Sequence, residues 1–110
     1  MLNIESLRFP SYELPPALDE LRREVRAFLE ESLKSYSALV RSNTWDGFDA
    51  DFSRKLGAKG WLGMTLPKAY GGHDRSALER YVVVEETLAA GAPVGFHWIA
   101  DRQSGPVVVR

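Results

Sequence analysis

The most informative part of the sequence is the segment Gly60-Trp61-Leu62-Gly63-Met64-Thr65-Leu66-Pro67-Lys68-Ala69-Tyr70-Gly71-Gly72. This segment is too short and too rich in glycine for a free-standing helix, so we expect a tight connector between helices. Gly60 suits the left-handed end of a preceding helix, and Gly71 and Gly72 are available for positive φ angles in a turn. The large apolar side chains of the connector are expected to fill the core: Trp61, Leu62, Met64 and Leu66.

Two amphipathic helices are predicted before this connector. The first runs from Ala17 to about Arg41, because apolar residues recur every three or four positions after Pro15-Pro16, a pair that suits a helix start. Its apolar stripe comprises Leu18, Leu21, Val25, Phe28, Leu29, Tyr36, Leu39 and Val40. The second and shorter helix is predicted over residues 45–60, where Phe48, Phe52 and Leu56 stand four residues apart on one face.

Two further helices are predicted after the connector. Ser76 and Glu79 fit a capping box, in which the serine hydroxyl and the glutamate carboxylate each accept a backbone hydrogen bond at the helix start. The helix that they open is expected to run to about Ala90 and to end at Gly91. It is apolar around most of its circumference, which predicts a central position with contacts on more than one side. A less regular helix is predicted over residues 94–103.

Both ends of the chain differ from the helical part. We expect residues 1–16 to be an extended leader, anchored through its apolar side chains Leu2, Ile4, Leu7, Phe9 and Tyr12. At the other end, Ser104-Gly105-Pro106 has the pattern of a new helix start, but only Val107-Val108-Val109-Arg110 follows. We therefore expect residues 17–110 to be one domain that is truncated at its C-terminal end. The alternative is a short C-terminal tail or an edge strand.

Composition excludes several classes of function. The 110 residues carry 14 Lys+Arg and 15 Asp+Glu, so a formal net charge of −1 gives no general attraction to nucleic acid. There is no cysteine, and two histidines are too few for a multi-histidine metal site. No apolar run approaches the ~20 residues of a membrane-spanning helix, and the N-terminus does not have the pattern of a signal peptide. We therefore expect a cytoplasmic protein that binds no nucleic acid and no metal.

The sequence offers few candidates for catalysis. Glu85 and Glu86 are adjacent carboxylates, but neighbours on a helix point about 100° apart, so a structural or solvated role is favoured over an acid–base pair. His97 and Asp101 stand four residues apart and can pair on one helix face. Packing is the favoured interpretation of that pair; the alternative is an imidazole oriented as a base, although no serine stands near it in sequence to complete a triad.

Aromatic residues are frequent enough to consider stacking on a flavin or a nucleobase. At helical spacing, however, such side chains are far more often part of a core. We therefore favour a core role for all five of these residues: Trp45, Phe48, Phe52, Trp61 and Trp98.

The connector and its flanks resemble the acyl-CoA dehydrogenase family. Members carry a GxxGxxxPxxYGG string at the equivalent place in their N-terminal helical domain, and this chain has it from Gly60 to Gly72. The surroundings agree in order, with a long amphipathic helix before the string and Glu85-Glu86-Thr87-Leu88-Ala89 and then Gly91 after it. The resemblance extends from about Ala17 to Arg110. It implies an all-α fold of about four to five helices in an orthogonal or bundle-like arrangement.

This resemblance also implies a function. Enzymes of the family are flavoproteins of lipid metabolism that contain FAD and dehydrogenate an acyl-CoA thioester between its α- and β-carbons. It implies an acyl-CoA substrate, an electron-transfer partner and a homo-oligomer for the complete enzyme. The catalytic glutamate and most flavin contacts belong to later parts of such enzymes, so no catalytic or cofactor-binding residue is assigned here, and the chain alone is expected to be inactive. By the same resemblance, residues 93–104 help to line the acyl group, with Phe96, His97 and Ala100 as the candidate substrate-binding residues.

Two alternatives remain open from the sequence. The chain can be a free-standing helical module that binds another protein, or the same domain of a related flavin oxidase or monooxygenase. The substrate class is open as well: Phe96 suits a short or branched acyl group, whereas His97 and Arg102 are polar residues that fatty-acyl pockets rarely need.

Overall fold

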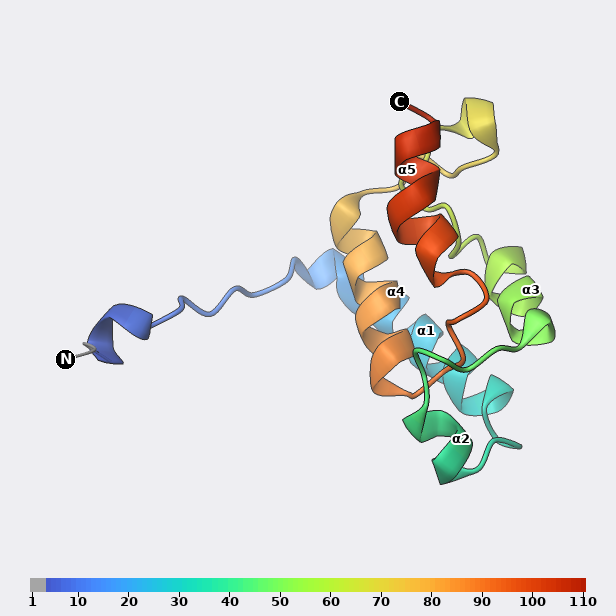
Figure 1. Ribbon diagram of the computed structural model, residues 1–110. Coiled ribbons are helices and arrows are strands. Elements are labelled where there is room, and N and C mark those ends of the chain that lie inside the picture. The colour runs from blue at the N-terminus through green and yellow to red at the C-terminus, as the bar shows by residue number, and fades with distance from the viewer. Residues whose placement is uncertain (1–3) are drawn as a thin grey trace.

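The computed structural model describes residues 4–110, which fold as α-helices joined by short turns (Figure 1). No strand occurs in this part of the chain, so the predicted all-α class is confirmed. The α-helices are α1 (Asp19–Ser32), α2 (Ala38–Ser42), α3 (Ala50–Ala58), α4 (Ala77–Ala89) and α5 (Gly105–Val108). Shorter helical turns are η1 (Ile4–Leu7), η2 (Pro16–Leu18), η3 (Lys68–Tyr70) and η4 (Ala100–Ser104), the last of which is a π-helical turn.

The core forms where α1 and α4 lie side by side (Figure 1). Helix α1 contributes residues at the three- and four-residue spacing that the sequence predicts, and α4 contributes Val82 and Val83. Helix α3 and the connector close the same cluster from the other side. The buried apolar residues of this cluster are Leu21, Val25, Leu29, Leu33, Phe52, Leu56, Trp61, Met64, Val82, Val83 and Ala92.

The predicted first helix is broken, which corrects the sequence expectation of one helix to about Arg41. Helix α1 ends at Ser32, and a turn leads to α2, where the Ser37 hydroxyl accepts a hydrogen bond from the backbone N–H of Val40 at 3.2 Å. A serine that caps a new helix N-terminus competes with continuation of the preceding helix. Tyr36 therefore lies in the turn rather than on a helix, and its hydroxyl donates a hydrogen bond to Asp49.

The second helix is also shorter than predicted, because Asp49 caps it. One Asp49 carboxylate oxygen accepts from the backbone N–H groups of Asp51 and Phe52, at 2.9 Å and 3.1 Å, so α3 begins at Ala50. Residues 45–48, predicted to be helical, instead form a loop before this cap.

The connector from Gly60 to Gly72 has the predicted turns, but Leu62 and Leu66, which were expected to fill the core, are only partly buried. Gly60 and Gly71 adopt φ angles of 74° and 83°, and Trp61 and Met64 are buried. Gly72 is required for a different reason than predicted. Its φ angle is not positive, but a Cβ atom there would lie 2.1 Å from the carbonyl oxygen of Leu66. The two glycines therefore serve two purposes, one conformational and one steric.

Helix α4 has the predicted capping box. The Ser76 hydroxyl accepts from the backbone N–H of Glu79 at 3.2 Å, and the Glu79 carboxylate accepts from the backbone N–H of Ser76 at 2.8 Å. The helix ends at Ala89, and Gly91 follows with a φ angle of 70°.

The last helix is continuous across Ser104-Gly105-Pro106, which were expected to begin a new helix. Residues 98–108, called the C-terminal helix below, pass through η4 directly into α5. The backbone N–H of Gly105 reaches the carbonyl oxygen of Ala100, five residues back. This wider turn precedes Pro106, which has no N–H to donate, and π-turns are one way in which a helix absorbs such an interruption. Val107 and Val108 are helical, so they do not form an edge strand.

The leader extends away from the helices (Figure 1). Its apolar residues Ile4, Leu7, Phe9 and Tyr12 are exposed rather than anchored, and Leu2 lies outside the described residues. Leu14 is the first side chain that packs against the core. No helix within residues 4–110 is long and apolar enough to cross a membrane.

Candidate functional site

Of the three predicted substrate-binding residues, Phe96 and His97 lie in the turn before the C-terminal helix and Ala100 lies in its first turn, and they do not point the same way. Phe96 is 49% exposed and packs against the exposed ring of Phe48, with 4.6 Å between the ring centroids. Ala100 is exposed as well. His97 is half-buried and faces inward, with Nδ1 2.7 Å from the hydroxyl oxygen of Ser53. The structure therefore places Phe96 and Ala100 at the surface and His97 behind them.

The loop before α3 fixes the position of this surface. The backbone N–H of Val94 donates to the carbonyl oxygen of Thr44 at 3.1 Å, and that of Gly95 donates to the carbonyl oxygen of Gly47 at 2.8 Å. A Cβ atom on Gly47 would lie 2.9 Å from Pro93, so a glycine permits this approach. These backbone bonds bring the loop aromatics against the aromatics of the C-terminal segment.

His97 and Asp101 have different partners, although a side-chain pair between them was predicted. The Asp101 carboxylate accepts a hydrogen bond from the backbone N–H of Gly63 and lies 3.8 Å from Nε of Arg80. Asp101 therefore attaches the C-terminal helix to the connector, and His97 attaches it to α3 through Ser53. Packing, the favoured interpretation of these residues, is the role that this geometry supports.

Ser53 is a serine that lies close to His97 in space but 44 positions away in sequence. A serine, a histidine and an aspartate thus meet in one region. Ser53 is only 5% exposed, however, and the Asp101 carboxylate is used by the connector rather than by the imidazole. A buried hydroxyl cannot reach a substrate carbonyl, so this group holds helices together and is not a catalytic triad.

His97 should make the stability of the domain depend on pH. Burial lowers the pKa of His97 below its usual value of 6.5, although the nearby Asp101 opposes this effect. In acid the unfolded chain therefore takes up a proton that the folded chain excludes, and stability falls as the pH drops below 6.5. We expect the free energy of unfolding, measured with urea, to fall more in the parent chain than in His97→Asn when the pH is lowered from about 8 to about 5. An equal loss in both proteins would contradict this role.

The adjacent carboxylates Glu85 and Glu86 converge on one cation. Nη1 of Arg22 in α1 binds Glu86 and lies 2.8 Å from Glu85, while Arg26 binds Glu86 through Nε at 2.7 Å. Glu86 is 7% exposed, and its arginine partners hold the pKa of its carboxyl below the usual range. A structural role, favoured from the sequence, is therefore confirmed for Glu86: it joins α4 to α1. The sequence gives one indication of these partners: Arg22 and Arg26 stand four residues apart, which puts both on one face of α1.

Glu86→Gln should weaken this joint. We expect a loss of about 1–2 kcal/mol in the free energy of unfolding at neutral pH, less than a fully buried ion pair would cost because the arginines reach solvent. Because the pKa of Glu86 is lowered in the folded state, this stability is present above a pH of 4.5 and is lost as the pH falls further. Glu85→Gln, at the more exposed neighbour, is the matched control, with an expected loss below about 1 kcal/mol. Equal losses in urea unfolding would contradict the assignment.

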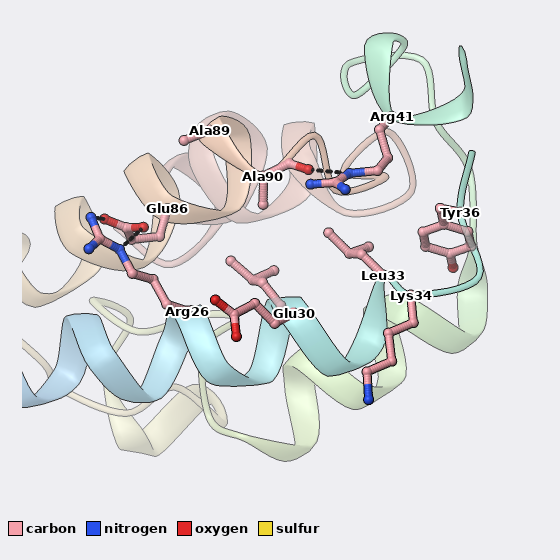
Figure 2. Close-up of a pocket in the computed structure, with 10 residues that line it drawn as sticks. Arg26, Glu30, Leu33, Lys34, Tyr36, Arg41, Glu86, Ala89 and Ala90 are labelled. Carbon is pink, nitrogen blue, oxygen red and sulfur yellow. Dashed lines mark hydrogen bonds and ion pairs between the residues drawn. The ribbon is translucent and has the colours of Figure 1, made fainter. Parts of the chain in front are cut away.

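A cleft of about 430 Å³ lies between α1, α2 and the end of α4 (Figure 2). Arg26 binds Glu86 at one end of it, and at the other end Nε of Arg41 donates to the carbonyl oxygen of Ala90 at 2.7 Å. Leu33 lies close to Arg41, at that end of the cleft. These two contacts join α1 to α4 and α2 to the residue after α4.

The predicted core role is right for only part of the aromatic set. Phe52 and Trp61 are buried, but Trp45 is 54% exposed and Phe48 is 71% exposed. Trp98 is partly exposed. It packs against Trp45 with the edge of one indole on the face of the other and 4.4 Å between the ring centroids. Within residues 4–110, no three His, Asp or Glu side chains are grouped to hold a metal ion.

The fold and the connector agree with one protein family. The family model described as acyl-CoA dehydrogenase, N-terminal domain, matches residues 15–110. The chain belongs to the acyl-CoA dehydrogenase family. The match covers α1 to α5 and therefore includes every residue of the surface described above.

Individual acyl-CoA dehydrogenases show the same similarity. Acyl-CoA dehydrogenase FadE26 of Mycobacterium tuberculosis (strain ATCC 25618 / H37Rv) is 33% identical over 86 residues, which are 74% of this chain and 22% of that protein. Mitochondrial isovaleryl-CoA dehydrogenase of Pongo abelii is 36% identical over 80 residues, 72% of this chain and 19% of the enzyme. The solved structure of the Tcur3481-Tcur3483 steroid ACAD is 35% identical with a TM-score of 0.69, over 90% of this chain and 26% of that one. The chain thus spans about a fifth of the length of the curated relatives it matches.

Proposed function

We propose that the chain forms the N-terminal helical domain of a flavin-dependent acyl-CoA dehydrogenase, which dehydrogenates an acyl-CoA thioester between its α- and β-carbons. The observation that carries this proposal is the family match over residues 15–110. The similarity of fold and sequence to a solved acyl-CoA dehydrogenase supports it. Because the chain spans about a fifth of its curated relatives, the activity is proposed for the enzyme to which the domain contributes.

Within that enzyme, we propose that Phe96 and Ala100 form part of the wall around the acyl group. Both are exposed, and they lie close together in sequence, Phe96 in the turn before the C-terminal helix and Ala100 in its first turn. The contact between Phe96 and Phe48 widens the apolar surface beside them. His97 has a positioning role, because its bond to Ser53 holds the start of the C-terminal helix on α3. An apolar acyl group suits such a wall.

In the complete enzyme FAD would supply the hydride acceptor. Helix N-termini are common sites for a pyrophosphate, and in this chain three of them carry side-chain caps. Ser37, Asp49 and Ser76 already accept hydrogen bonds from first-turn backbone N–H groups of α2, α3 and α4, which leaves fewer of these donors for a pyrophosphate. We therefore assign flavin binding to other parts of the enzyme, and assign this chain to shaping the acyl site.

Purification of the protein from its native cells, with an affinity tag at the N-terminus, tests the proposal. We expect a flavin-containing polypeptide of the length of its relatives, whose flavin absorbance bleaches when acyl-CoA is added. A 12.3 kDa chain that carries no flavin and copurifies with unrelated proteins would instead support an interaction module. The 110-residue chain mixed with FAD and acyl-CoA should show no turnover; stoichiometric flavin retention would contradict our assignment of the flavin.

The acyl wall has its own test in the same enzyme. Ala100→Phe should raise KM for acyl-CoA substrates, because a large side chain projects from the proposed wall. Ala17→Phe, at an exposed position before α1, is the matched control and should leave KM unchanged. If Ala100→Phe also leaves KM unchanged, this surface does not contact the acyl group.

A further inference from the structure

A second cleft, of about 350 Å³, lies where α4 faces the C-terminal helix and the loop that carries Trp45. This is a common size for sites that hold small molecules. It is lined by two arginines, Arg80 and Arg102, and by three aromatic rings, those of Trp45, Tyr81 and Trp98. No carboxylate lines it. We call it the arginine cleft.

Arg80, which lines this cleft, has an unused donor. Its Nε atom is buried and has no hydrogen-bond partner among residues 4–110. The nearest acidic group is Asp101, whose carboxylate is 3.8 Å away and accepts a hydrogen bond from Gly63. Buried donors are nearly always satisfied, and a guanidinium is suited to grip an oxyanion through two parallel N–H groups.

The rest of the cleft offers a second charge and flat surfaces. The guanidinium carbon of Arg102 lies 5.1 Å from the centroid of the Trp98 ring, over its face. Trp45 contacts Trp98 edge-on, so the two indoles present faces in different directions. Both charged side chains that line the cleft are arginines, and the carboxylates beside it already have partners, Asp101 in Gly63 and Glu85 in Tyr81. Such a site favours an anion that is attached to a flat apolar body.

We propose that the arginine cleft binds a small aromatic oxyanion, with its carboxylate or phosphate at Arg80 and Arg102 and its ring against Trp45 and Trp98. Trp98 and Arg102 project from a different side of the C-terminal helix than Ala100, so this is not the proposed acyl wall. The proposal concerns binding alone. It holds or fails independently of any dehydrogenase activity.

Nuclear magnetic resonance of the three indole N–H groups in the 110-residue chain provides the test. Trp45 and Trp98 line the cleft, whereas Trp61 is buried and does not line it, so Trp61 serves as an internal reference. Titration with 2-naphthoate or 2-naphthyl phosphate is expected to shift the signals of Trp45 and Trp98 to saturation and to leave Trp61 in place. Whichever of the two probes binds more tightly shows whether the cleft prefers a carboxylate or a phosphate. Uncharged 2-naphthalenemethanol should bind at least about tenfold more weakly, because it lacks the charge-assisted bonds.

Substitutions then locate the binding. Arg102→Gln, which changes an exposed residue, and Arg80→Gln should each lower the affinity for 2-naphthoate by about tenfold or more. Arg23→Gln, on the exposed face of α1, is the matched control and should bind as the parent does. The proposal is overturned if neither anion gives a saturable shift, if the uncharged probe binds equally well, or if Arg102→Gln binds 2-naphthoate with unchanged affinity.

Discussion

Gly72→Ala is expected to destabilise the domain by about 3 kcal/mol, at the upper end of what overpacking costs. The new methyl group would lie 2.1 Å from the carbonyl oxygen and 2.4 Å from the carbonyl carbon of Leu66. This carbonyl cannot simply turn away, because it accepts the backbone N–H of Asp74 at 3.0 Å. The backbone on both sides of the connector must therefore move. Urea unfolding followed by far-ultraviolet circular dichroism measures the loss.

Gly71→Ala is the matched control one residue earlier. A Cβ atom on Gly71 would meet no other atom within 4 Å, so only the strain of its φ angle of 83° opposes the substitution. That strain should cost about 1–2 kcal/mol. If Gly72→Ala is less harmful than Gly71→Ala, the close approach of the two backbone segments is not as we describe.

Trp61→Ala is expected to cost about 3–5 kcal/mol, the range for removing a large aromatic residue from a core. Trp61 is 4% exposed, and its ring meets Phe28 edge-on at 5.3 Å between centroids. Its loss would leave a cavity between α1 and the connector. Because small domains are stable by only about 5–15 kcal/mol, we expect the thermal unfolding midpoint to fall by many degrees or the chain to be partly unfolded.

Trp45→Ala provides the comparison for Trp61→Ala. Trp45 is 54% exposed, and its edge-on contact with Trp98 is its only ring contact among the described residues. We expect a loss of about 1 kcal/mol. Similar losses for the two tryptophans would mean that the connector does not fill the core.

Local features of the fold could be predicted from sequence because they depend on a few neighbouring residues. The capping box at Ser76 and the left-handed Gly60 and Gly71 are examples, since their geometry is set within one turn. The break after Ser32 was missed for a related reason. Apolar periodicity continues across it, and the Ser37 cap, which ends the continuity, looks from the sequence like any exposed serine of a helix.

The candidate site was harder to predict because its parts are distant in sequence. Ser53 meets His97 across 44 positions, and Arg26 meets Glu86 across 60. Spacing along one helix can suggest that His97 and Asp101 pair, but it does not show that α3 and the connector supply better partners. The exposed aromatics have a similar explanation: backbone bonds from Val94 and Gly95 hold the loop containing Trp45 against the C-terminal segment, and such bonds leave no pattern in side-chain type.

The π-turn at Ala100–Ser104 sets the rotational phase of everything that follows it. An α-helix advances about 100° per residue, and a π-turn holds one residue more than the α-helical turn it replaces. If the same residues wound as a regular α-helix, Val107 and Val108 would be rotated by about 100° relative to Trp98, whereas deleting one residue from this turn would restore α-helical winding and leave them facing as they do. The π-turn therefore sets the direction in which the exposed Val107 and Val108 point, separately from the direction of the cleft-lining Trp98.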